Sequence, residues 1–435
     1  MDEKVLRQAI DEYQTPFYIF DIDALAAQIK RIRDALGAYG EVCYAMKANP
    51  FIVAELLDIV DSFEVCSPGE FHICERAGIP MEKIVMSGVY KNPKDIAYAV
   101  EKYGDRGVYT AESYTQWKVL RDCARRSGVI LNVLLRLGAG SQFGMEESVI
   151  RRIVGERDET KCLNIEGIQL FTGTQKKAAG KYKRELGTLM ELIRSLEDEY
   201  GFHPLRLEYG PGLPICYFDE EENAEERMLS ALVQELKALD FDGKIVLEMG
   251  RFIAAPCGSY VTSVVDTKGR EGQAYCIVDG GIHHMNYYGQ MMAMKRPPVI
   301  HWKTEEAADH SPENGECGGS GGIDEIGGTS GGNDESRQAG MSESHRLSEA
   351  DRPKEWTVCG SLCTMNDVLL KQYPFEGLSK GDKLIFERVG AYSVTEGISL
   401  ILSRPLPQVI LYSQANGFRV ARGHFPTDRL NWFES

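Results

Sequence analysis

Lys47 is the first residue of this sequence whose type and position suggest chemistry. It closes the apolar run VCYAMK at residues 42–47. Apolar surroundings remove water from an ammonium group, so we expect the pKa of Lys47 to be lowered. A neutral amine in such a place suits Schiff-base formation with a carbonyl group. The alternative is a surface lysine whose stem covers apolar residues while its head stays in water, and Lys47 alone does not decide between the two.

Groups later in the chain could complete a site around this amine. Gly210 and Gly212, in the run LRLEYGPGLP, could offer backbone N–H groups to a phosphate, and Thr174 could add a hydroxyl. Glu248 ends another apolar run, where a carboxylate could keep a ring nitrogen protonated. A tight turn or a helix cap would explain each glycine or threonine alone. Together, an amine, a phosphate site and a carboxylate point to pyridoxal 5′-phosphate as the cofactor.

A barrel of parallel strands would bring these residues together. Eight short apolar runs alternate with helical patterns in the first 255 residues. The runs are 42–47, 63–67, 84–88, 108–111, 130–136, 165–171, 205–210 and 244–250. Such strands need cover on both faces, and eight strand–helix units in about 250 residues predict an α/β fold with a closed (β/α)8 barrel. An open, doubly wound sheet is the alternative, but the count favours closure. The active site of such a barrel lies at the carboxyl ends of its strands.

The chain after residue 256 has a different pattern. Strand-like alternation with Gly and Pro turns predicts an antiparallel β-sandwich or β-barrel domain there. The early run PFYIFD at 16–21 has no place in the barrel and is expected to join that second sheet. We therefore expect a barrel domain at 25–255 and a β domain built from 1–24 and 256–435.

The formal net charge of −16 is unevenly distributed. Residues 304–354 contain twelve acidic and four basic residues, a net charge of −8, together with ten of the 44 glycines. So polar a segment cannot bury enough apolar surface to offset the entropy lost on ordering, which predicts a disordered insertion in the β domain. A regulatory or partner-binding loop is the alternative.

Composition argues against several classes of protein. The acidic balance disfavours nucleic-acid partners and anionic membrane surfaces. No apolar run approaches the roughly 20 residues that span a bilayer, and the start MDEKVLRQAI lacks the layout of a signal peptide. The eleven cysteines form no CxxC pair, which indicates free thiols in a reducing cytoplasm and neither a disulfide framework nor a metal site.

Around the candidate site residues Lys47, Gly210, Gly212 and Glu248, the sequence resembles the fold type III pyridoxal-phosphate decarboxylases. This is the family of diaminopimelate, ornithine and arginine decarboxylases. The segments that carry the resemblance occur in the family's order over nearly the whole chain outside 304–354. They are Tyr44–Pro50, Arg136 with Ser141–Gly144, Leu207–Pro214, Glu248–Arg251, Gly360–Cys363 and Gly390–Tyr392. The resemblance implies decarboxylation of an L- or D-configured α-amino acid, with diaminopimelate as the default substrate.

The resemblance also implies roles for individual residues. Lys47 would form the Schiff base with the cofactor and Glu248 would bond its pyridine nitrogen. Cys363 would enter the site of the neighbouring subunit of a homodimer and reprotonate the α-carbon. Further cofactor contacts are implied for Arg136, Phe171, Thr174, Gly210, Gly212, Gly250, Arg251 and Tyr392. Substrate contacts are implied for Arg251, Thr364, Asp367 and Tyr288, and no metal site is implied.

Departures from the family pattern bear on the substrate. Phe171 replaces a histidine that stacks on the cofactor, and Pro211 replaces a glycine, which removes one N–H donor. Thr364 follows the cysteine where members that bind a distal ammonium carry Asp or Glu. The Arg-Pro pair that diaminopimelate enzymes use is not at its usual place in 280–298. The runs FTGTQ and CTMND are more similar to decarboxylases of antibiotic or siderophore pathways, including those whose amino acid is tethered to a carrier protein.

Two other functions fit the same resemblance less well. Amino-acid racemases of this barrel type place arginine on the pyridine nitrogen, so Glu248 disfavours that activity. A non-catalytic homologue would have no reason to keep Lys47, Glu248, Cys363 and Tyr392.

Overall fold

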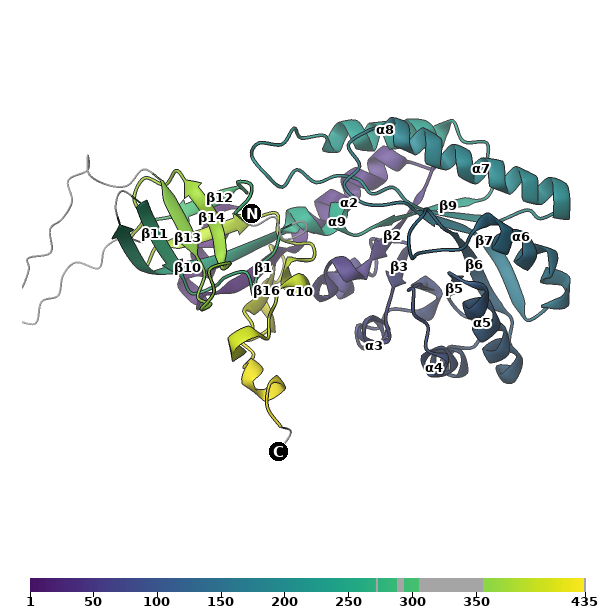
Figure 1. Ribbon diagram of the computed structural model, residues 1–435, viewed down its shortest axis with the longest axis horizontal. Coiled ribbons are helices and arrows are strands. Elements are labelled where there is room, and N and C mark those ends of the chain that lie inside the picture. The colour runs from purple at the N-terminus through teal and green to yellow at the C-terminus, as the bar shows by residue number, and fades with distance from the viewer. Residues whose placement is uncertain (271–272, 288–292, 305–354, 434–435) are drawn as a thin grey trace, which may run out of the picture.

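The computed structural model describes residues 1–270, 273–287, 293–304 and 355–433, and everything below refers to these residues. A closed barrel and a mixed β-sheet lie side by side along the long axis of the molecule (Figure 1). The barrel has eight parallel strands in chain order, which confirms the predicted (β/α)8 fold. They are β2 (Glu41–Ala45), β3 (Ser62–Val65), β4 (Ile84–Met86), β5 (Val108–Ala111), β6 (Leu131–Leu137), β7 (Leu163–Phe171), β8 (Arg206–Gly210) and β9 (Lys244–Met249).

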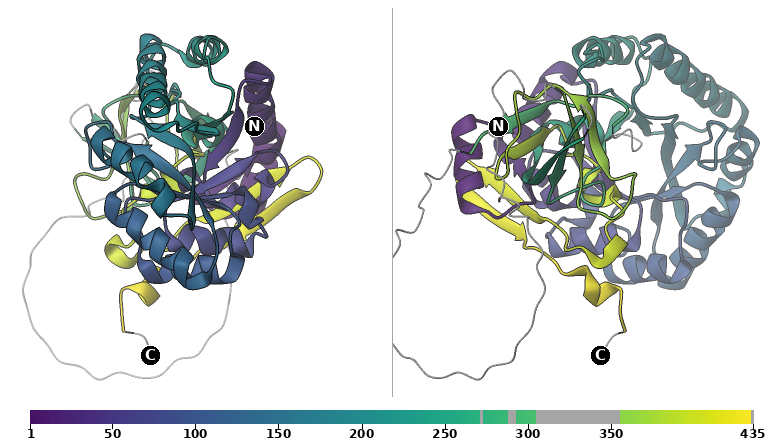
Figure 2. Two further views of the ribbon diagram at one scale, coloured as in Figure 1. Left: turned by 90° about the vertical axis from the view of Figure 1, so that its right-hand side faces the viewer. Right: turned by 60° about the vertical axis from the view of Figure 1, so that its left-hand side comes forward.

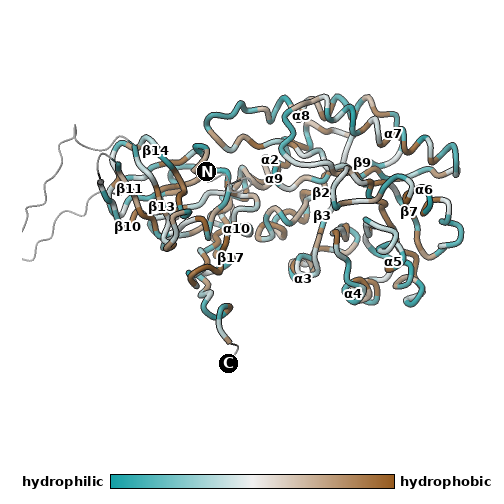
Figure 3. Tube along the Cα trace, viewed as in Figure 1, coloured by the Kyte–Doolittle hydropathy of each residue, from teal (hydrophilic) through white to brown (hydrophobic). Residues whose placement is uncertain are grey.

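Helices surround the barrel, and local sequence signals define their ends. Ser67, Asn92 and Ser113 each accept a backbone N–H with their side chains at helix starts, while Gly128 and Gly201 end helices in the left-handed conformation. The long helices alternate hydrophobic and hydrophilic residues as their surfaces turn from core to solvent (Figure 3). The longer helices are α1 (Glu3–Glu12), α2 (Ile22–Leu36), α3 (Pro68–Arg76), α4 (Pro93–Tyr103), α5 (Tyr114–Ser127), α6 (Glu147–Gly155), α7 (Gly180–Tyr200) and α8 (Glu225–Lys237).

The inside of the barrel changes from apolar to polar along the strands. Five buried side chains form an apolar cluster of their own: Cys43, Val85, Val108, Leu134 and Val246. Because side chains alternate between the two faces of a strand, residues two positions further on point to the same side. These residues are Ala45, Ser87, Thr110, Arg136 and Glu248. Most of the inward side chains at the carboxyl end of the barrel are therefore polar, and the layer below them is apolar.

The second sheet has nine strands and contains the early run of residues 16–21. β1 (Phe17–Asp21) lies between β10 (Gly258–Arg270) and β16 (Gln408–Ser413). In the rotated views an early and a late segment of the chain, β1 and β16, lie side by side in this sheet (Figure 2). The other strands are β11 (Gln273–Val278), β12 (Val299–Trp302), β13 (Trp356–Cys359), β14 (Val368–Tyr373), β15 (Lys383–Glu387) and β17 (Gly417–Arg422).

Most strand pairs of this sheet are antiparallel, as expected, but two are parallel. β1 pairs in parallel with β16, and β11 with β13. In both pairs a long stretch of chain separates the partners, and a long connection is what parallel pairing needs. The alternation of apolar and polar residues within one strand does not show in which direction the neighbouring strand runs. The sequence pattern therefore could not reveal these parallel pairs.

Close contacts join the two domains at the barrel mouth. The backbone N–H of Tyr392 donates to the carbonyl of Ala48 at 2.6 Å, and the Asn49 side-chain amide donates to the carbonyl of Gly390 at 2.9 Å. A Cβ on Gly390 would lie 1.9 Å from the carbonyl oxygen of Ala254, so this approach requires glycine. The contacts fix Tyr392 beside the carboxyl ends of the barrel strands.

Two expectations cannot be compared with the structure. Except for Thr304, the segment 304–354 lies outside the described residues, as does Tyr288.

The ten cysteines that are described are all free thiols. None of the described helices is long and apolar enough to cross a membrane.

Candidate active site

A pocket at the carboxyl ends of the barrel strands brings together most of the residues singled out from the sequence. Counting its open mouth, it holds about 540 Å³. Nine of the expected site residues line it: Lys47, Arg136, Phe171, Thr174, Gly212, Glu248, Gly250, Arg251 and Tyr392. Glu64, from β3, is a further lining residue. The pocket lies where a (β/α)8 barrel places its chemistry.

The amine of Lys47 is held as an ion pair. Its Nζ lies 2.7 Å from Oε2 of the buried Glu64 and 3.5 Å from Sγ of Cys66. Burial acts to lower the pKa of Lys47, but the charges of Glu64, Cys66 and Tyr392 outweigh it and the pKa is raised well above its ordinary value. The expectation of a lowered pKa was therefore wrong. It considered the apolar strand that carries Lys47 and missed the carboxylate on the neighbouring strand.

Glu248 lies in a group of carboxylates. Burial raises its pKa well above the ordinary range, and the negative charges of Glu64 and Glu208 raise it further. Glu208 forms an ion pair with Arg206, and the side-chain amide of Gln169 donates to Oε1 of Glu248. Burial and like charges disfavour the ionised form of Glu248, so a positively charged partner such as a protonated ring nitrogen would stabilise that form.

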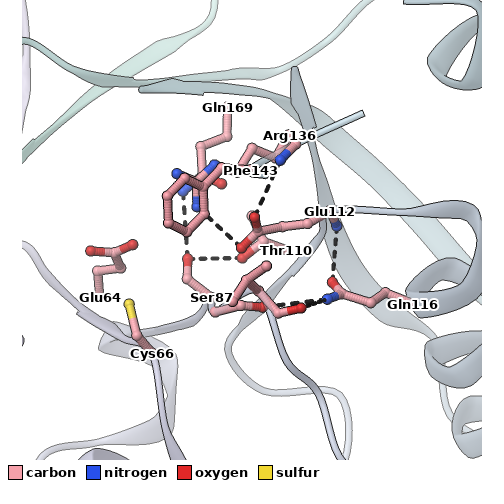
Figure 4. A network of polar contacts seen from close by, with 12 residues as sticks. Glu64, Cys66, Ser87, Thr110, Glu112, Gln116, Arg136, Phe143 and Gln169 are labelled. Atoms are coloured by element: carbon pink, nitrogen blue, oxygen red, sulfur yellow. Dashed lines mark hydrogen bonds and ion pairs between the residues drawn. The ribbon is translucent and has the colours of Figure 1, made fainter. Parts of the chain in front are cut away.

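A polar network continues from Gln169 across the barrel mouth (Figure 4). The amide of Gln169 lies 3.5 Å from the hydroxyl of Ser87, and Thr110 donates to that hydroxyl at 2.8 Å. Arg136 donates from Nη1 to Glu112 at 3.1 Å, and its guanidinium lies 5.1 Å from the centre of the Phe143 ring. Figure 4 shows these side chains converging from the ends of several barrel strands and the loops after them, with Glu64 and Cys66 beside them.

Two loops form a cradle beside this network. Gly212 has φ +59°, and a Cβ there would lie 2.1 Å from the carbonyl oxygen of Gly173. A Cβ on Gly210 would lie 2.4 Å from the Phe171 ring, so this glycine leaves space for the ring although it does not itself line the pocket. Thr174, which follows Gly173, also lines the pocket. Backbone N–H groups at such loops are typical anion-binding groups.

Arg251 closes the same side of the pocket. Its Nη1 donates to the hydroxyl of Tyr217 at 2.9 Å, and its guanidinium lies 4.4 Å from the centre of the Tyr392 ring. The cation therefore lies in the pocket wall in contact with the aromatic side chains of Tyr217 and Tyr392.

These residues fit pyridoxal phosphate. The cofactor needs an amine, a partner for its ring nitrogen, a ring to stack on and a phosphate cradle, and the pocket offers Lys47, Glu248, Phe171 and the two loops. Among the described residues, Nε of Arg136 is buried without a hydrogen-bond partner, as expected of a group that a ligand would satisfy. The described residues hold no cluster of three His, Cys, Asp or Glu side chains that could bind a metal.

Comparison with known families identifies the chain. Residues 22–255 match the family described as "Pyridoxal-dependent decarboxylase, pyridoxal binding domain", and residues 328–390 match "Pyridoxal-dependent decarboxylase, C-terminal sheet domain". The chain belongs to the pyridoxal-dependent decarboxylases. It is thus an amino-acid decarboxylase with pyridoxal phosphate as its cofactor.

Relatives of this decarboxylase act on different substrates. It is 24% identical to the L-glutamyl-[BtrI acyl-carrier protein] decarboxylase of Niallia circulans, over 94% of this chain and 92% of the relative. It is 26% identical to the diaminopimelate decarboxylase of Aquifex aeolicus, over 64% of this chain and 70% of that relative. The crystal structure of a diaminopimelate decarboxylase from M. jannaschii has the same fold, with a TM-score of 0.79 and 20% identity over 99% of this chain and 94% of that one.

Cys363, Thr364 and Asp367 lie apart from the pocket of the decarboxylase. They belong to the loop between β13 and β14, and none of them lines the pocket around Lys47 within one chain. Cys363 and Thr364 are exposed. Asp367 is buried, and its carboxylate accepts the backbone N–H groups of Ile282 and Leu362 at 2.8 and 2.7 Å. That carboxylate holds the loop together, and its part in substrate binding stays a prediction.

Sequence reasoning missed several polar residues of the decarboxylase pocket. Gln169, Ser87, Thr110 and Glu112 all lie at or just beyond the carboxyl ends of apolar strands. A polar side chain at the last inward position of an apolar strand was the available signal. The same signal is present at Arg136 and Glu248, which the family motifs also indicated.

Proposed function

We propose that this decarboxylase acts on an α-amino acid whose side chain ends in an acyl group joined to a carrier protein. The proposal rests on the groups that the loop from Gly360 to Asp367 exposes. Its exposed tip presents Cys363, Thr364 and Met365, and its one acid, Asp367, is buried and accepts two backbone N–H groups. The loop thus offers no free carboxylate to a distal ammonium group. The match to a decarboxylase of a carrier-bound glutamyl group over nearly the whole of both chains supports the same substrate class.

Free diaminopimelate is the second candidate. The family resemblance and the match to the Aquifex aeolicus diaminopimelate decarboxylase favour it. Diaminopimelate carries a second ammonium and a second carboxylate, and each needs a partner of opposite charge when water is removed. The absence of an acid directly after Cys363, where Thr364 stands, makes diaminopimelate the weaker candidate.

The pocket residues take distinct roles in this proposal. Pyridoxal phosphate, when bound, supplies an electron sink for the electron pair left by the departing carbon dioxide. Lys47 provides the amine that holds the cofactor and later displaces the product. Glu248, as a carboxylate beside the ring nitrogen, would favour the protonated form of that nitrogen. Phe171 would stack on the ring, while Thr174, the Gly210–Gly212 loop, Gly250, Arg251 and Tyr392 would hold the phosphate.

A second copy of the chain completes the site. The exposed thiol of Cys363 does not line the pocket of its own subunit, so we infer that Cys363 of the partner subunit delivers a proton to the α-carbon at the pocket of Lys47. This requires a homodimer with shared active sites. The free thiols agree with the reducing cytoplasm that the sequence predicts, and that location stays a prediction.

Release of carbon dioxide tests the substrate. We would assay the holoenzyme with free meso-diaminopimelate, free L-glutamate, and L-glutamyl thioesters of pantetheine and of an acyl-carrier protein, using Lys47→Ala as the inactive control. We expect turnover of the thioesters and little or none of the free acids. Efficient turnover of free diaminopimelate and none of the thioesters would overturn the proposal in favour of the second candidate.

A further inference from the structure

A buried ion pair lies behind the cradle that we assign to the cofactor phosphate. Lys176, in the loop between β7 and α7, is 3% exposed, and its ammonium lies 2.7 Å from Oε2 of Glu185 on α7. Burial lowers the pKa of Lys176, against the opposing charge of Glu185. A buried charge pair costs desolvation energy that its own attraction seldom exceeds, so the pair calls for an explanation other than stability.

Glu185 connects the pair to both loops of the cradle. Besides Lys176, its carboxylate accepts the hydroxyl of Thr172 at 2.6 Å and the hydroxyl of Tyr209. Thr172 begins the loop that leads to Thr174, and Tyr209 precedes Gly210 at the end of β8. One carboxylate on a helix thus holds the start of each loop.

Lys176 connects the same two loops directly. Its backbone N–H donates to the carbonyl of Gly212 at 2.9 Å, and its Nζ lies 3.4 Å from the carbonyl oxygen of Gly210. Both carbonyls are therefore turned toward Lys176. Gly212 itself lines the pocket, so a contact that fixes its carbonyl also fixes the loop at the pocket wall.

Pro211 explains why the two loops need to be held in place by Lys176 and Glu185. Proline has no N–H to offer, so the loop from Gly210 to Gly212 has one phosphate donor fewer than a run of glycines would have. The remaining donors must be well placed, and preorganised groups bind more tightly than groups that must first be ordered.

We propose that Lys176 and Glu185 are positioning residues for the cofactor phosphate, holding the loops 172–174 and 210–212 in the geometry that binds it. This inference rests on the proposed placement of the phosphate at these loops. It assigns a role to two side chains that do not themselves line the pocket.

The experiment compares pyridoxal phosphate with pyridoxal, which lacks the phosphate. We would titrate apoenzymes with each ligand by absorbance and compare dissociation constants. Lys176→Met is expected to weaken binding of pyridoxal phosphate by roughly tenfold and to change pyridoxal binding by less than about twofold. The matched control is Lys177→Met, which removes a half-exposed lysine one residue away that pairs with Glu221, and we expect it to bind both ligands as the wild type does.

A second variant keeps the test decisive if Lys176→Met fails to fold. Lys176→Met leaves the partly buried carboxylate of Glu185 without its cation, and combining it with Glu185→Gln removes that charge. The double variant should fold and still lose affinity for pyridoxal phosphate selectively. Equal loss of both ligands, or no loss of either, would overturn the inference.

A third variant separates this inference from the phosphate placement itself. Thr174→Val removes a hydroxyl from the cradle and should also weaken pyridoxal phosphate selectively. If Thr174→Val weakens binding of pyridoxal phosphate alone and Lys176→Met does not, the role of Lys176 and Glu185 is wrong, but the phosphate still binds at these loops. If neither is selective, the phosphate binds elsewhere and both are wrong.

Discussion

The ammonium of Lys47 and the carboxylate of Glu64 face each other across neighbouring strands, 2.7 Å apart. The pair keeps the amine charged, because the pKa of Lys47 is raised and that of Glu64 is lowered, although burial acts in the opposite sense on each. Since only a neutral amine attacks an aldehyde, Glu64 restrains the residue that must bind the cofactor.

Removing this carboxylate should change how the apoenzyme takes up its cofactor. In Glu64→Gln the pKa of Lys47 falls, so the pH at which the rate of pyridoxal phosphate binding is half-maximal should move to lower values. Stopped-flow absorbance between pH 6 and 10 would measure it. Asp34→Asn, which breaks the exposed pair with Lys30, is the control. An unchanged pH profile in Glu64→Gln would contradict this role.

The contact between Gly210 and Phe171 gives a steric prediction. In Gly210→Ala the new methyl group would displace the Phe171 ring, which we expect to cost about 1–3 kcal/mol of stability and to weaken cofactor binding by roughly tenfold. Gly187→Ala, in α7, meets open space and should be neutral or stabilising by up to about 1 kcal/mol. Thermal unfolding and cofactor titration would measure both effects. Adding Phe171→Ala to Gly210→Ala should recover stability but not affinity, and a failure to recover it would refute the clash.

Gln169 should affect catalysis through Glu248. In Gln169→Leu the amide donor to Glu248 is lost, so we expect kcat to fall by roughly tenfold with KM nearly unchanged. The ¹⁵N chemical shift of labelled cofactor would report the proton at its ring nitrogen, which a purely structural change would not alter. Asn164→Leu, at the other end of β7, should leave both kcat and the shift unchanged. A normal shift in Gln169→Leu would exclude this role.

Subunit mixing tests the shared site. Lys47→Ala and Cys363→Ala should each have little activity alone. Random mixing after mild dissociation should restore about a quarter of wild-type activity, because half of the dimers are mixed and each mixed dimer has one intact site. Mixtures that stay inactive, or a fully active monomer in sedimentation experiments, would disprove the role of Cys363.

The paired histidines His283 and His284 predict loss of stability in acid. Burial lowers their pKa values, to about 4 and about 3, so both are neutral in the folded protein over a range where the unfolded chain binds protons. The free energy of unfolding should therefore fall as the pH drops from about 6.5 toward 4, by roughly 1.4 kcal/mol per pH unit for each histidine. His283→Leu should make this slope shallower, whereas the exposed His203→Gln should not. Urea unfolding at several pH values would show whether the two slopes differ.

Much of the fold and site could be predicted because the information is local. Eight apolar runs, each followed by a helical pattern, specify a parallel barrel, and the barrel specifies that strand ends carry the chemistry. Lys47, Arg136 and Glu248 could therefore be assigned to one pocket without any contact being known. The early strand at 16–21 could be excluded from the barrel by counting alone.

The remaining features depend on which side chains meet across elements. The pKa of Lys47 depends on Glu64, which lies on the neighbouring strand, and the role of Asp367 depends on two N–H groups from different loops. Lys176 and Glu185 meet only because α7 packs against the loops after β7 and β8. By itself the sequence determined the barrel, the cofactor chemistry and the residues at the strand ends, since periodicity and motifs are properties of short segments. Only the tertiary structure decided how those residues are charged and held, because electrostatic interactions and hydrogen bonds act through distances that the order of residues does not contain.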